Sequence, residues 1–127
     1  ANNSPAAVYM TPAYVKTHKD FMDNQIKIIE ETYTKVGNDN QVLVIPVGLA
    51  FDLAYQEQPS IKLHRPDATH PSLLGTYLAA CTVFSSIYGK TPIGLKYDYY
   101  GAINEKDKMF LQATAFKATS IYYNKEQ

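Results

Sequence analysis

The sequence predicts an α/β fold with about two parallel strands flanked by helices, and three observations lead to this prediction. Residues 42–45 are all apolar and mostly β-branched, which is typical of a strand covered on both faces in a parallel sheet. Residues 18–36 repeat apolar side chains at helical spacing. The order of strand, helix, strand and then three helices is that of a right-handed crossover between parallel strands. We expect the 127 residues to form one domain, 1–127, with a core of its own.

The first strand is expected at residues 7–11, where Pro12 ends it because proline cannot donate to a β-ladder. The helix over 18–36 carries one apolar stripe, formed by Met22, Ile26, Ile29, Tyr33 and Val36. Gly37 fits the left-handed residue that follows a helix, and residues 38–40 then form a turn.

The second strand is followed by a short helix, expected over 49–56 and stopped near Pro59. Residues 60–66 are expected to form an irregular connection, with Ile61 and Leu63 pointing inward.

A third helix is expected after the loop 67–72 and ends at Gly89. Pro71 suits its first turn, where the missing N–H is not needed. Its buried stripe is predicted to comprise Leu74, Leu78, Cys81, Phe84 and Tyr88. A turn-rich segment then leads to the last helix, expected over 105–122 and capped by Asn104.

Composition and charge exclude several function classes. Twelve Lys and Arg balance twelve Asp and Glu without forming blocks, so we expect no nucleic-acid partner and no polybasic membrane surface. The first residues show no signal-peptide pattern, and the compartment stays open. The single Cys81 excludes an internal disulfide and, in its apolar setting, predicts a buried, inert thiol.

The strongest chemical signal is Asp67, three residues before His70 at the mouth of an apolar helix. In a serine hydrolase, a histidine takes the proton of the nucleophile as a general base, and an acid holds the imidazole in the useful tautomer. The same spacing also fits a structural role, in which Asp67 caps the backbone N–H of Thr69 or His70.

The surrounding residues favour the catalytic interpretation. Asp-x-x-His-Pro-Ser (67–72), Gly-Thr-Tyr-Leu-Ala-Ala-Cys (75–81) and Tyr-Gly-Lys-Thr-Pro-Ile-Gly-Leu (88–95) resemble the C-terminal part of the SGNH (GDSL-type) hydrolases. Residues 44–51 resemble the final strand and short helix of a bacterial subgroup, and residues 8–14 resemble its preceding strand.

The resemblance implies that the chain is the C-terminal half of a flavodoxin-like, three-layer SGNH domain. It also implies that Asp67 is the catalytic acid and His70 the catalytic base, with no cofactor and no metal. A metal-dependent hydrolase built on His64, Asp67 and His70 is the least favoured alternative, because the histidine spacing matches no familiar metal pattern.

The sequence contains no Gly-Asp-Ser nucleophile motif and lacks the glycine and asparagine blocks that complete the family's oxyanion hole. Residues 37–40 have the wrong order for the latter block, and no serine lies at a predicted strand-to-helix elbow; the serines considered are Ser72, Ser85, Ser86 and Ser120. We therefore expect the C-terminal segment of an esterase, acting on esters such as acetylated carbohydrates. It should be inactive unless an N-terminal segment or a partner chain completes it.

The alternative is a stand-alone, non-catalytic binding protein derived from the same fold, which forms a homodimer by burying an open sheet edge at residues 42–45 or 8–11. Two further features stay ambiguous at the level of sequence. His64 and Arg65 line the rim of the site or form a surface loop. The last helix docks a partner or packs into the core through the side chains of Met109, Phe110, Ala113 and Phe116.

Overall fold

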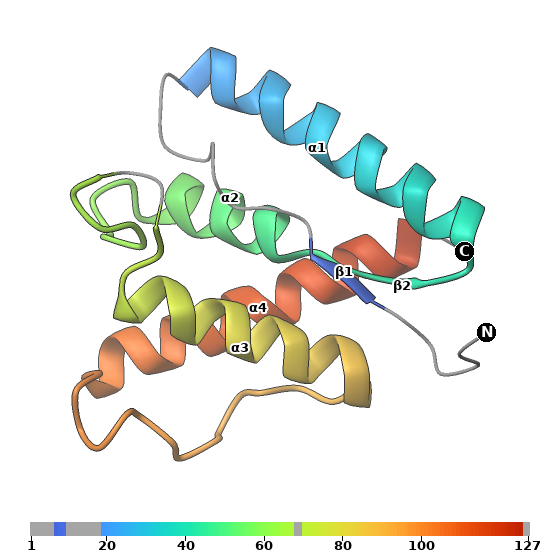
Figure 1. The fold of residues 1–127 in the computed structure, drawn as a ribbon. Helices are drawn as coiled ribbons and strands as arrows, with labels where there is room; N and C mark the ends of the chain where they lie inside the picture. Colours follow the sequence, from blue (N-terminus) through green and yellow to red (C-terminus); the bar gives the residue numbers. More distant parts are fainter. Residues whose placement is uncertain (1–6, 10–18, 68–69, 126–127) are drawn as a thin grey trace.

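The computed structural model of the chain describes residues 7–9, 19–67 and 70–125. Its elements are β1 (Ala7–Tyr9), α1 (Lys19–Asn40), β2 (Leu43–Ile45), α2 (Val47–Glu57), α3 (Leu73–Tyr88) and α4 (Glu105–Lys125) (Figure 1). The predictions for residues 10–12 and for His18 lie outside the described residues, as does the side chain of Met22.

The prediction of a three-layer α/β fold is wrong. Within the described residues, four helices of 22, 11, 16 and 21 residues dominate, and β1 and β2 contain three residues each. These two strands pair in parallel, with Val8 opposite Val44, but so short a ladder forms no layer for helices to cover. The apolar run that predicted a buried strand changes into a helix immediately after Pro46, which has no N–H for a ladder.

Burial is therefore mainly between helices. Helix α2 contacts each of the other three helices, and α3 and α4 pack against each other along the lower part of Figure 1. The most enclosed part of α2 contains Ala50, Phe51 and Ala54, none of which is exposed to solvent. The inward orientation predicted for Leu63 is confirmed, because this side chain is also fully buried. In the described part of the chain, we find no helix both long and apolar enough to cross a bilayer.

Helix α1 extends beyond its predicted end. Gly37 lies inside the helix and is buried, and a Cβ at this position would overlap the side chain of Val44. The glycine is therefore used for the close approach of α1 to β2, and the predicted stop is wrong. The left-handed residue is Gln41 instead, with φ of 55°.

Helix α3 begins at Leu73, directly after the predicted loop, so Pro71 lies before its first turn and not in it. Ser72 is the N-cap, and Pro71 precedes it. Gly89 ends the helix with φ of 62°, as predicted. In the predicted stripe, Leu78 and Cys81 are buried, but Tyr88 is 65% exposed and does not belong to the core.

Helix α4 has the predicted cap, because Asn104 Oδ1 accepts a 2.8 Å hydrogen bond from the N–H of Asp107. Core packing accounts for only part of its predicted apolar set, because Phe110 packs against the core whereas Met109 is 58% and Phe116 39% exposed. The face that packs inward instead consists of Leu111, Gln112, Ala115, Ala118, Thr119 and Tyr122.

Candidate acid and base pair

Asp67 and His70 are in direct contact. Asp67 Oδ2 lies 2.6 Å from His70 Nδ1, and Asp67 Oδ1 accepts the backbone N–H of His70 at 3.1 Å. The second bond is the structural cap that the spacing also predicted. One carboxylate therefore holds both the backbone and the ring of the same histidine.

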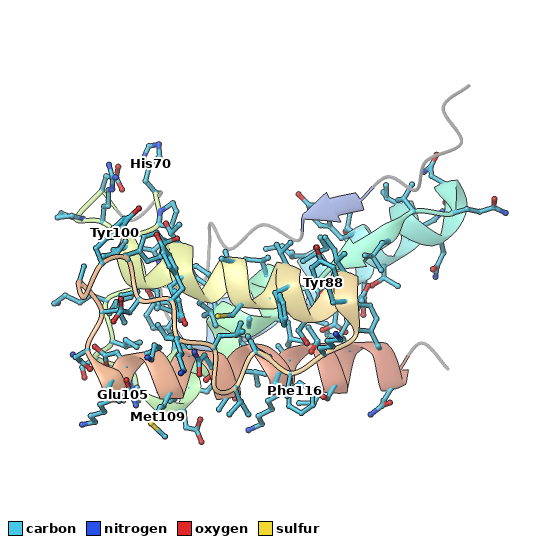
Figure 2. The ribbon with its side chains drawn as sticks, turned by 90° about the horizontal axis from the view of Figure 1, so that it is seen from below. His70, Tyr88, Tyr100, Glu105, Met109 and Phe116 are labelled. Atoms are coloured by element: carbon cyan, nitrogen blue, oxygen red, sulfur yellow. The ribbon has the colours of Figure 1, made fainter. Side chains whose placement is uncertain are left out.

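This geometry selects the basic nitrogen of the neutral imidazole. A carboxylate only accepts hydrogen bonds, so His70 Nδ1 carries the hydrogen in this contact. The lone pair is then on Nε2, which is the arrangement a general base uses when an acid orients it. The His70 side chain is 70% exposed, and Figure 2 shows it projecting from one end of the molecule. At such exposure an ion pair adds little stability, so the contact mainly orients the ring.

The pair lies on a short loop, residues 64–71, which we call the acid–base loop. Residues 68 and 69 of this loop lie outside the described residues. An antiparallel bridge between His64 and Pro71 closes its base, and the N–H of Arg65 donates to the carbonyl of His70 at 2.8 Å. The two ends of the loop are therefore held next to each other by backbone pairing.

Two residues join the acid–base loop to α3. Ser72 Oγ donates to the carbonyl of Lys62 at 2.6 Å and accepts the N–H of Gly75 at 3.2 Å. A Cβ on Gly75 would overlap the backbone carbonyl of Leu63, so only glycine lets α3 come this close. We did not assign these positioning roles from the sequence. The available signals were a serine three residues before a glycine and a glycine within the first helical turn.

His64 supports the loop from within the core. Its ring is buried, stacks on Tyr55 with centroids 5.8 Å apart, and meets Phe51 edge-on at 5.4 Å. His64 Nδ1 lies 2.7 Å from Tyr55 Oη, and burial raises the pKa of Tyr55. The prediction of a surface loop at this residue is wrong.

The described serines offer no elbow at which a nucleophile would be presented. The strand-to-helix turn between β2 and α2 holds Pro46. Ser85 is buried in α3 and bonds to Thr119 at 2.9 Å. Among the residues that the structure describes, no group of three or more His, Cys, Asp or Glu could hold a metal ion.

An open surface hollow of about 440 Å³ follows the C-terminal half of α1, away from the pair. Its lining side chains are Glu30, Glu31, Thr34, Lys35, Asn38 and Asp39. Because all six come from one helix, the hollow does not form part of the acid–base site.

Comparison with known proteins identifies a fold neighbour. No protein-family model and no curated protein matches the chain. The chain is similar to the crystal structure of a DUF4886 family protein from Bacteroides uniformis, with 23% sequence identity and a TM-score of 0.77. The match covers 94% of this chain and 49% of that chain, so our chain spans about half the length of its neighbour. The comparisons thus give a shared fold with a DUF4886 family protein, and they do not support the hydrolase or SGNH assignments.

Proposed function

We propose that the chain supplies the acid and the base of a serine-esterase site whose nucleophile and oxyanion donors come from another segment. The observation that carries the proposal is the 2.6 Å contact between Asp67 Oδ2 and His70 Nδ1. It leaves Nε2 as the basic nitrogen, on an exposed side chain that another segment could approach. The resemblance of residues 67–95 to the end of an SGNH hydrolase points in the same direction.

The chemistry assigned to each residue is limited and specific. His70 Nε2 would take the proton of a serine hydroxyl as that oxygen attacks the ester carbonyl, and would return it to the leaving alcohol. Asp67 would stabilise the imidazolium formed between these two steps. General-base help alone is worth about 10²- to 10⁴-fold in rate. The 127-residue chain should therefore be almost inactive without the nucleophile.

The half-length match is compatible with this division of the site. A protein of the neighbour's length has room for a second segment of similar size. Whether the gene encodes such a segment is tested by the DNA upstream of the Ala1 codon. The proposal expects an open frame that includes a strand followed by Gly-Asp-Ser.

The functional experiment measures hydrolysis of p-nitrophenyl acetate by the chain alone and after addition of the upstream segment. We expect activity only in the combination, with loss of at least about 100-fold in the His70→Ala variant. Asp39→Asn is a matched control, because Asp39 forms an equally short, exposed pair with Lys35 on α1. Activity that survives His70→Ala, or no activity in the combination, would contradict the proposal.

A second candidate is the non-catalytic binding protein, acting as a homodimer. The exposed Met109 and Phe116 on α4 favour it, because large apolar side chains at helical spacing often mark contact surfaces. It predicts that the chain sediments as a dimer and that Met109→Lys yields a monomer. A monomeric wild-type chain at high concentration would rule it out.

A further inference from the structure

The segment between α3 and α4, residues 89–104, carries a group of tyrosines that the acid and base chemistry does not use. We call this segment the tyrosine loop. Tyr97 is 55% and Tyr100 95% exposed, and their ring centroids lie 6.1 Å apart at an interplanar angle of 74°. Tyr99 lies beneath them and touches Tyr97, with centroids 5.1 Å apart. The two outer rings therefore meet at a steep angle and form a corner on the surface, in which each residue is more than half exposed.

The tyrosine loop is held in place by a buried amide. Gln112 Nε2 donates to Tyr77 Oη at 2.9 Å and to the carbonyl of Leu95 at 2.8 Å. Gln112 Oε1 accepts the N–H of Gly94 at 3.0 Å, and Tyr77 meets Tyr99 edge-on with centroids 6.1 Å apart. A chain of contacts thus runs from the core to the exposed rings, so the corner is positioned before any ligand arrives.

The backbone of the loop is strained where the rings are presented. Tyr99 and Tyr100 have φ of 56° and 60°, and Gly101 follows with 84°. Bulky residues rarely adopt this left-handed region, and Asp98 Oδ1 stabilises the turn by accepting the N–H of Gly101 at 2.8 Å. Tyr100 is 95% exposed, so its ring gains almost no stability from burial. Packing therefore does not explain why position 100 is a tyrosine. Strain of this kind concentrates at functional sites.

We propose that Tyr97 and Tyr100 bind a sugar ring of a neutral oligosaccharide. The face of a tyrosine ring is electronegative and attracts the C–H bonds on one face of a pyranose, while the phenol hydroxyls exchange hydrogen bonds with sugar hydroxyls. The charged residues of the loop are Lys90, Lys96 and Asp98, which is too weak a positive charge to select phosphates or nucleic acid. The chemistry therefore favours an uncharged ligand with both apolar faces and hydroxyl groups.

The position of the corner relates it to the acid–base loop. The tyrosine loop runs from the end of α3 to the start of α4 (Figure 1), and Figure 2 places its residue Tyr100 at the same end of the molecule as His70. A carbohydrate ester held by the tyrosines would lie at the end from which His70 projects. That the bound sugar is the substrate of the acid and base rests on the proposed function, whereas sugar binding itself rests on the tyrosine loop.

The experiment measures binding of cello-, xylo- and chito-hexasaccharides to the 127-residue chain with ¹³C-labelled tyrosine rings by NMR. Absence of tryptophan leaves tyrosine fluorescence as a second readout free of interference. We expect saturable binding of at least one sugar, weakened about tenfold or more in Tyr97→Ala and in Tyr100→Gly. Tyr100→Gly removes the ring and suits the left-handed backbone, so it keeps the loop folded.

The matched control is Tyr88→Ala, which removes a tyrosine that is 65% exposed at the opposite end of α3 (Figure 2). Binding unchanged in this variant supports the proposal. No saturable binding of any of the three sugars, binding that survives Tyr100→Gly, or a proline-rich peptide as the sole ligand of these rings would overturn it. The assay requires no ester hydrolysis, so sugar binding by the wild-type chain, together with no esterase activity in the combination with the upstream segment, would mean that the proposed function fails while this inference stands.

Discussion

The acid–base loop and the part of the tyrosine loop around Tyr100 lie at the same end of the molecule (Figure 2) but are held in different ways. The acid–base loop is fixed by backbone hydrogen bonds between neighbours in sequence and by the cap at Ser72. The tyrosine loop has local hydrogen bonds within residues 98–103, and it is also tied to the core by one buried side chain, Gln112, from the helix that follows it. Hydrogen bonds between residues close in sequence can be predicted from a short sequence pattern, whereas a contact from a distant helix cannot. This explains why we predicted the pair of Asp67 and His70 and missed the tyrosine corner.

The largest effect on stability is expected from removing the side-chain amide of Gln112. Gln112→Leu leaves three polar groups without their partner, at Tyr77, Gly94 and Leu95, and an unsatisfied buried group is costly. We expect a loss of about 3 kcal/mol in the free energy of unfolding, measured by urea denaturation. Hydrogen exchange at the N–H of Gly94 should accelerate, while exchange at the N–H of Arg65 in the other loop should not. Equal acceleration at both would show that the two loops are not held independently.

The second largest effect is expected from disrupting the contact between α3 and Leu63, which supports the acid–base loop. Gly75→Ala forces a Cβ against the Leu63 carbonyl, which is backbone and cannot rotate away. We expect a loss of about 2 kcal/mol in the free energy of unfolding. Thr76→Ala, at the exposed neighbouring position, controls for helix propensity. If Gly75→Ala were as stable as Thr76→Ala, α3 would not need its close approach to Leu63.

Alkaline pH tests, without mutation, how much the buried hydroxyl of Tyr77 contributes to stability. Burial raises the pKa of Tyr77 from 10.0 to about 12 and that of Cys81 from 9.0 to about 11. Because both groups bind their protons more tightly in the folded state, their contribution to stability is complete below pH 9 and is lost as pH rises toward 12. Urea midpoints at pH 8, 9, 10 and 11 should therefore fall progressively, by less than the Gly75→Ala change at pH 10. Tyr77→Phe should flatten the decline above pH 10, and an unchanged decline would contradict the role of Tyr77.

A smaller effect measures the strain at Tyr100. Tyr100→Gly and Tyr100→Ala remove the same ring, so their difference reports the left-handed backbone. We expect the glycine variant to be more stable by about 1 kcal/mol, from thermal unfolding of both. The order should reverse at Thr76 in α3, where alanine suits the helix better than glycine. If alanine were the more stable at Tyr100 as well, the backbone there would not be strained.

The sequence predicts local features of this fold better than its layers. The caps at Asn104 and Gly89 follow from short-range chemistry and are confirmed. The apolar run 42–45 predicts a strand, but it does not reveal how many other strands pair with that strand. The three-layer fold that we inferred from it is wrong. Gly37 shows a similar limit, because a glycine that ends a helix and one that admits a neighbour look alike until Val44 is placed beside it.

The smallest effect on stability should accompany the most specific effect on chemistry. Asp67→Asn changes an exposed pair, so we expect the free energy of unfolding to shift by less than about 1 kcal/mol. The amide can donate to His70 Nδ1, which would move the imidazole proton to Nε2 and remove the basic lone pair from that atom. Long-range ¹H–¹⁵N NMR of the neutral ring should show the proton on Nδ1 in the wild-type chain and on Nε2 in the variant. Asp39→Asn should leave the ring unchanged. A wild-type ring already protonated on Nε2 would mean that Asp67 does not orient His70 as a base. The spacing of Asp67 and His70 would then serve only to cap the loop.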